Sequence, residues 1–206
     1  MSTYSSAAKM EVFNESLDEL TKCVFYTDIG KEYEPEVSEQ ELKKSAWIGS
    51  LLANSEDDTH RKKALSFAVL YYVQNRKNER EPLCRRYLYT VLSRLGNTPT
   101  ANALADRIED DNVKIAEEGS LLDAEIHFTE EFYRFNKETI FTDFQKRVWA
   151  NLEKDYFVFS GPTSSGKSFL LQTYIDYKVE QEEGFQGIYL VPSRALISEV
   201  STKFKQ

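Results

Sequence analysis

One eight-residue segment carries glycine, lysine and hydroxyl residues at a spacing that suits phosphate chemistry. It fits the pattern G-x-x-x-x-G-K-[ST], in which the glycines let the backbone turn tightly around an anion. A predicted strand precedes the segment and a predicted helix follows it, so amide groups at the helix N-terminus face the same anion. The pattern therefore predicts a loop that binds the phosphates of a nucleotide. The segment is Gly161-Pro162-Thr163-Ser164-Ser165-Gly166-Lys167-Ser168.

The residue types within this loop predict separate roles. The backbone amides from Ser164 to Ser168 are expected to point at the β-phosphate. Lys167 is the candidate catalytic residue, because its amine is a mobile charge for the β and γ oxygens. The hydroxyl of Ser168 is placed to ligate Mg²⁺, and it is the candidate metal ligand. The expected cofactor-binding residues of the loop are Gly161, Thr163, Ser164, Ser165, Gly166, Lys167 and Ser168.

Two further residues are candidates for binding, and local sequence leaves each open. Gln145 lies 16 residues before Gly161, and its amide could pair with N6 and N7 of an adenine. It also completes a capping box with Thr142, in which it would bond back to the backbone. Arg194 follows the second predicted strand, at the end where parallel sheets bind ligands, and a guanidinium fork there could contact nucleic-acid phosphate. Taken locally, a surface arginine is the favoured interpretation.

The elements that must position these residues differ between the two halves of the chain. Helical periodicity predicts helices over 11–22, 38–53, 61–73, 82–95 and 98–108, and the 61–73 helix is apolar nearly all round. Strands are predicted at 156–160 and 187–191, with helices at 141–152 and 167–179. A strand, a helix and a second strand in this order indicate a parallel βαβ unit. We therefore expect an α+β protein: an acidic helical domain at 1–110 and the beginning of a parallel-sheet α/β domain at 111–206.

Other chemistry-bearing residues favour structural interpretations. His60 and His127 are isolated, and the carboxylate runs at 56–58 and 109–111 are typical of solvated turns. The aromatic face formed by Phe128, Phe132 and Phe135 is expected to be core rather than a platform that stacks bases. Cys23 and Cys84 fit neither a metal site nor a disulfide framework, which favours a reducing, cytoplasmic location.

Composition excludes several classes of protein. The 206 residues carry a net charge of −8, and residues 1–127 alone hold 16 basic and 23 acidic side chains. Generic binding to nucleic acid needs a basic face, so any such contact must be local. The acidic helical region is instead a candidate surface for a protein partner. No run of 18 apolar residues is present, which argues against a membrane span.

The last third of the chain resembles the start of the first RecA-like domain of superfamily 2 DEAD/DEAH-box helicases. The resemblance rests on three segments in order: 141–145, 161–168 and 190–196. It implies an ATP-dependent helicase with ATP and Mg²⁺ as cofactors, Gln145 as the adenine contact, and single-stranded DNA or RNA as partner. It also implies that Pro192, Ser193 and Arg194 contact the strand. Ser164 and Ser193 replace the Gly and Thr that the family usually carries.

The resemblance explains neither the helical region nor the end of the sequence. Helicase subunits of antiphage-defence systems of the Hachiman type are similar in carrying an acidic helical region ahead of such a core, which would imply a role in antiviral defence. No D-E-x-[DH] segment and no second RecA-like domain follow the loop. We therefore expect an N-terminal segment of a longer helicase that hydrolyses ATP poorly by itself. The alternatives are another phosphate-loop ATPase or kinase, and an acidic helical protein-interaction module.

Overall fold

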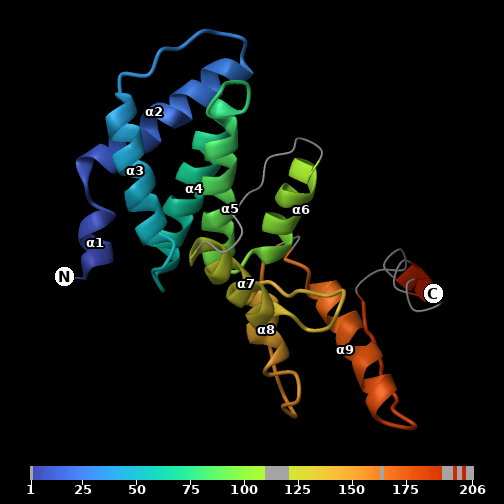
Figure 1. The fold of residues 1–206 in the computed structure, drawn as a ribbon. Coiled ribbons are helices and arrows are strands. Elements are labelled where there is room, and N and C mark those ends of the chain that lie inside the picture. Colours follow the sequence, from blue (N-terminus) through green and yellow to red (C-terminus); the bar gives the residue numbers. More distant parts are fainter. Residues whose placement is uncertain (1, 110–120, 163–164, 192–196, 199–200, 203–206) are drawn as a thin grey trace. The chain divides into compact units, whose positions relative to one another are not determined.

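The computed structural model describes residues 2–109, 121–162, 165–191, 197–198 and 201–202 (Figure 1). Contacts within it define two units, Met1–Asp143 and Phe144–Gln206. We call the first the helical unit and the second the loop unit, since it contains the candidate phosphate loop. The domain boundary predicted between 110 and 111 falls outside the described residues and stays a prediction.

Helices make up most of the helical unit, and five of them cover the five ranges predicted within residues 1–110. α2 is the main departure, because it runs six residues past its predicted end at 22. The described helices of this unit are α1 (Thr3–Ala7), α2 (Glu11–Asp28), α3 (Glu39–Leu52), α4 (Asp58–Asn75), α5 (Glu81–Arg94), α6 (Thr98–Glu109) and α7 (Leu121–Tyr133) (Figure 1).

α4 lies at the centre of the helical unit, where a helix that is apolar nearly all round can be covered by neighbours. It packs against α2, α3 and α5, and α6 then packs against α5. Phe67 of α4 is fully buried, and its ring lies 5.5 Å from that of Phe13 on α2. Leu52 and Val91 complete this core from α3 and α5, also fully buried. Burial of each large apolar side chain contributes roughly 1.5–3 kcal/mol, so this core stabilises the unit.

Local capping signals set the ends of two helices. At the start of α3, the Ser38 hydroxyl accepts a bond from the Glu41 amide, and the Glu41 carboxylate accepts one from the Ser38 amide at 2.7 Å. At the end of α5, Gly96 takes a φ of +69°, which glycine adopts without steric cost. The Asn97 amide then bonds the Leu92 carbonyl at 2.9 Å. Ser38 with Glu41 thus forms a capping box, and Gly96 forms a glycine cap.

The polar connector between α2 and α3 is held by one buried carboxylate. Glu19 of α2 accepts hydrogen bonds from the Tyr33 hydroxyl and the Glu36 amide, both at 2.9 Å. It also pairs with Lys22 at 2.7 Å. These donors, Lys22 first, lower the pKa of Glu19 from 4.5 to about 2. A single side chain therefore fixes a loop that has little apolar surface of its own.

The loop unit contains two clear helices in its described part. α8 (Asp143–Trp149) begins at the last residue of the helical unit, and α9 (Lys167–Gln181) follows the candidate loop. The Trp149 ring packs edge-on against Tyr174 and Tyr177 of α9, with ring centroids 5.6 and 5.5 Å away. These aromatic contacts join α8 to α9.

The predicted α+β fold class is wrong for the residues that the structure describes. Neither 156–160 nor 187–191 forms a strand there, and the described part of the chain contains no parallel sheet. The side chains of Tyr156, Val158, Ile188 and Leu190 are 95%, 94%, 88% and 87% exposed. The segments have the composition of strands, but a strand needs neighbours to take up its backbone hydrogen bonds.

The predicted burial of the aromatic face on α7 is also wrong. Phe128 and Phe132 are 73% and 61% exposed. Phe135 follows the helix and is half-buried, and its ring stacks on buried Phe141 at 5.0 Å. The three rings share a helical spacing, but α7 ends at Tyr133, so the third ring no longer belongs to that face.

Candidate functional site

The candidate loop ends at a glycine with a left-handed backbone conformation. Gly166 is the N-cap of α9 and has a φ of +75°, in the left-handed region that favours glycine. Glycine has no side chain that could accept a bond from the first amides of this 15-residue helix. An uncapped N-terminus of this kind attracts negative charge through its amides and the helix dipole.

Lys167 lies across its own loop. Its Nζ donates to the carbonyl oxygens of Gly161 at 2.8 Å and Pro162 at 2.7 Å, and it lies 3.5 Å from the Ser165 hydroxyl oxygen. The amine therefore bonds the backbone at the start of its own loop, and the Lys167 side chain is half-buried. Phosphate oxygens placed there would accept from the same ammonium group.

The glycine that starts the loop is packed against α8. A Cβ at position 161 would lie 2.9 Å from the Phe144 ring and 3.0 Å from the Ser165 hydroxyl. Any larger residue must therefore displace an aromatic ring. The sequence gives Phe144 no predicted role, and its position beside Gln145 is the one signal that could have marked it.

Gln145 and the loop are brought together although 21 positions separate Gln145 from Gly166. Gln145 is 6% exposed, and its Nε2 would lie 2.3 Å from a Cβ added to Gly166. A larger residue at 166 would have to move the end of the Gln145 side chain, and the positive φ would strain it in any case. The structure places Gln145 beside the loop, and both of its predicted roles, adenine contact and capping, stay predictions.

Two further predicted site residues, Ser168 and Ser165, flank Gly166 and Lys167. Ser168 is exposed in the first turn of α9, next to Lys167. Ser165 is partly buried, and its amide bonds the Pro162 carbonyl at 3.3 Å. The remaining candidates lie outside the described residues, and their roles stay predictions: Thr163, Ser164, Pro192, Ser193 and Arg194.

The other candidate sites do not supply chemistry. Within the described ranges, no group of three His, Cys, Asp or Glu side chains could hold a metal ion. His60 takes part in a hydrogen bond with the buried Ser55 hydroxyl at 2.9 Å, which is the structural role expected of it. No helix in the described part of the chain combines the length and apolar character of a membrane span.

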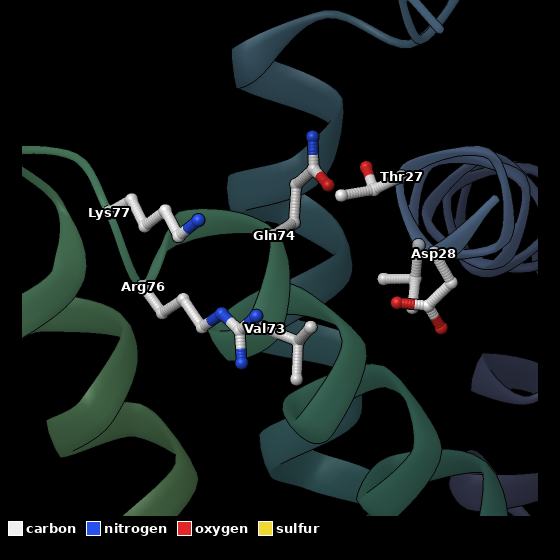
Figure 2. Close-up of a pocket in the computed structure, with 7 residues that line it drawn as sticks. Thr27, Asp28, Val73, Gln74, Arg76 and Lys77 are labelled. Carbon is white, nitrogen blue, oxygen red and sulfur yellow. The ribbon is translucent and has the colours of Figure 1, made fainter. Parts of the chain in front are cut away.

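A groove of about 150 Å³ lies between the ends of α2 and α4 in the helical unit (Figure 2). Figure 2 shows Thr27 and Asp28 on one side and Gln74, Arg76 and Lys77 on the other. These polar side chains are all exposed, and one carboxylate opposes two cations. The groove therefore lacks the buried, convergent polar groups of a small-molecule site.

The loop unit contains nearly all the residues that match a known protein family. Residues 142–206 match the DEAD/DEAH box helicase family. The matched range begins just before Gln145 and contains the whole candidate loop. No curated protein and no solved structure matches the chain.

The helicase match confirms the resemblance at the level of the superfamily. It covers about a third of the chain and leaves the helical unit outside the matched range, apart from its last two residues. The narrower resemblance to Hachiman-type subunits is not supported by this match, and it stays a prediction. Ser164 and Ser193, the two departures from the family pattern, both lie within the matched range.

Proposed function

We propose that this chain supplies the nucleotide-binding part of an ATP-dependent nucleic-acid helicase or translocase. The single observation that carries the proposal is the contact between Gln145 and Gly166. It places an amide able to recognise a base beside a loop with an uncapped helix N-terminus. The helicase family match over the same residues supports this assignment.

The residues present fit ATP with Mg²⁺ by the chemistry of their donors. The α9 amides and the Lys167 ammonium would bind phosphate oxygens, and the Ser168 hydroxyl would ligate the Mg²⁺ carried by the nucleotide. Bound Mg²⁺ would neutralise phosphate charge. Phe144 packs against Gly161 and would support the turn of the loop.

The remaining parts of the proposal concern partners and location. Pro192, Ser193 and Arg194 would contact a single strand of DNA or RNA in the complete enzyme, and the acidic helical unit would bind a protein partner. Cys23 and Cys84 are both buried free thiols, which fits a reducing cytoplasm. A Hachiman-type antiviral role is the narrowest form of this proposal.

Nucleotide binding by the full chain tests the proposal through two variants. Lys167→Ala should weaken ATP binding about 10- to 100-fold, because each charged hydrogen bond contributes roughly 1.5–3 kcal/mol. Gln145→Ala should leave GTP binding unchanged while removing the preference for ATP. Isothermal titration calorimetry with ATP and GTP would measure both effects.

Lys154→Ala is the matched control, because Lys154 is an exposed lysine of the same unit outside the loop. It should bind ATP like the unchanged chain. Equal ATP affinity in the Lys167→Ala and Lys154→Ala variants would contradict the proposal. A kinase or other phosphate-loop ATPase would instead keep its base preference after Gln145→Ala.

A further inference from the structure

A cavity of about 330 Å³ lies within the helical unit, between the end of α1 and the first two turns of α4. Its lining side chains carry three nitrogen donors and two hydroxyls, and among the described residues that line it there is no carboxylate. Such a lining favours an anion, although the surrounding unit is acidic. The lining residues are Ser5, Ala8, Lys9, Thr59, His60 and Lys63.

Lys63 is the fixed cation of this cavity. Its Nζ donates to the Ala8 carbonyl oxygen at 3.1 Å and to Asn14 Oδ1 at 2.7 Å. An ammonium group has three N–H donors, so one of them remains for a ligand. The Lys63 side chain is half-buried, and its two bonds hold it in place before a ligand arrives. Binding therefore does not have to order this side chain, which lowers its entropic cost.

A buried hydroxyl decides which nitrogen of His60 is left for a ligand. The Ser55 hydroxyl oxygen accepts the Asp57 amide at 3.2 Å and lies 2.9 Å from His60 Nδ1. The described residues offer the Ser55 proton no other acceptor, so the bonding pattern assigns that proton to Nδ1. In the neutral ring Nε2 then carries the hydrogen and is a donor. Because His60 lines the cavity, this donor is the second fixed N–H group of the site.

A second cavity of about 330 Å³ shares two lining residues with the first and differs from it in charge. Glu56 and Asp57 line this second cavity. Asp57 Oδ1 accepts the Thr59 amide at 2.7 Å, so its carboxylate is held at the start of α4. An anion is therefore favoured beside Lys63 and repelled from the second cavity, where hydroxyl or amino groups would find acceptors.

We propose that the two cavities bind a small phosphate monoester, with its phosphate group beside Lys63 and its ester end in the second cavity. The inference goes beyond the proposed function, and the site uses residues of the helical unit alone. A phosphate monoester carries close to two negative charges at neutral pH, which matches the ammonium groups of Lys9 and Lys63. Volumes near 330 Å³ lie at the lower end of small-molecule sites, so they suit a small ester better than a nucleic-acid strand.

Nuclear magnetic resonance of the two histidine rings tests the inference in the full chain at constant pH and ionic strength. The background is Lys167→Ala, so that the candidate phosphate loop does not compete for the probe. Inorganic phosphate should shift the His60 ring signals saturably. Ribose 5-phosphate should do so at lower concentration, because its hydroxyls reach the acceptors of the second cavity. His127 of α7 is the internal reference, since it lines neither cavity.

Lys9→Gln should weaken the binding of ribose 5-phosphate about twofold to fivefold, the range of an exposed ion pair. Lys62→Gln is the matched control, since Lys62 is an exposed lysine of α4 that does not line the cavity, and its affinity should not change. Equal affinities in these two variants would overturn the inference, because binding would then be a general attraction to surface charge. His60 signals that do not move with either probe would also overturn it.

A short single strand of DNA separates the two sources of a phosphate group. The strand should shift the His60 signals only at higher concentration than ribose 5-phosphate does. A strand that binds more tightly than the ester would overturn the inference in favour of a nucleic-acid backbone, and an ester that binds no more tightly than inorganic phosphate would overturn the role of the second cavity. The proposed function is measured separately through ATP and GTP, so none of these outcomes decides it.

Discussion

At the scale of single residues, Gly49 and Tyr87 form a contact with no room for another atom. A Cβ at Gly49 of α3 would lie 2.5 Å from the Tyr87 hydroxyl oxygen. That oxygen is buried with no hydrogen-bond partner among the described residues, and burial raises the pKa of Tyr87. The hydroxyl has lost its hydrogen bonds to water and has gained none within the described structure, so its burial lowers the free energy of unfolding.

This contact predicts opposite effects for two substitutions. Gly49→Ala should lower the free energy of unfolding by about 1–3 kcal/mol, the usual range for overpacking a core. Tyr87→Phe should be neutral or stabilising, and it should recover much of the loss when combined with Gly49→Ala. Urea unfolding of the two single variants and the double variant would measure this coupling. Strictly additive effects would show that the two residues do not share the contact.

Some residues of the candidate site were predictable from the sequence, and others were not. The loop pattern at 161–168 was recognisable because its glycines, lysine and serine are contiguous and each has a chemical role. The packing of Phe144 on Gly161 was not predictable, because an aromatic residue gives no sign of the surface that it will cover.

At the scale of elements, the connector between α2 and α3 depends on the ionised form of Glu19. The pKa of Glu19 is lowered from 4.5 to about 2 by its bonds to Lys22, Glu36 and Tyr33. A lowered pKa means that the stabilisation is complete above pH 4.5 and is lost as the pH falls toward 2. Lys22 is half-exposed, so solvent screening reduces the effect to on the order of 2 kcal/mol.

Glu19→Gln should therefore destabilise the chain at pH 7 by about 2 kcal/mol and should flatten the fall in stability between pH 4.5 and pH 2.5. Thermal unfolding followed by circular dichroism across this range would measure the change. Glu15→Gln is the matched control, since Glu15 is an exposed glutamate of the same helix. If the stability of the unchanged chain and of Glu19→Gln fell in parallel as the pH was lowered, the stabilising role of the ionised Glu19 carboxylate would be contradicted.

Elements whose signals are local were predictable from sequence, and elements that need distant partners were not. The capping box at Ser38 and the glycine at 96 lie within one turn of the helix ends that they set. The strands predicted at 156–160 and 187–191 rested on composition alone. Strand composition describes a surface that fits a sheet, and it does not provide neighbouring strands.

At the scale of the whole molecule, the two units differ in what stabilises them. The helical unit buries large apolar side chains from four successive helices, α2 to α5, and α6 adds Ala101 to the same cluster. In the loop unit, Leu170 is fully buried and Val148 nearly so, while several large apolar side chains are exposed. Apolar burial is the main source of stability, so the helical unit should be the more resistant to local opening.

Hydrogen exchange tests this difference together with the corrected fold class. Amides of α4 should exchange slowly, because their helix is surrounded by packed neighbours. Amides in 156–160 and 187–191 should exchange within the first minute at neutral pH. In the described structure neither segment is a strand, so no β-sheet hydrogen bonds protect them. Mass spectrometry of peptic fragments at 25 °C would separate these segments, with α9 as an internal helical reference from the same unit. Strong protection of both segments would contradict the corrected fold class. Hydrogen bonds between paired strands are what would protect both sets of amides together.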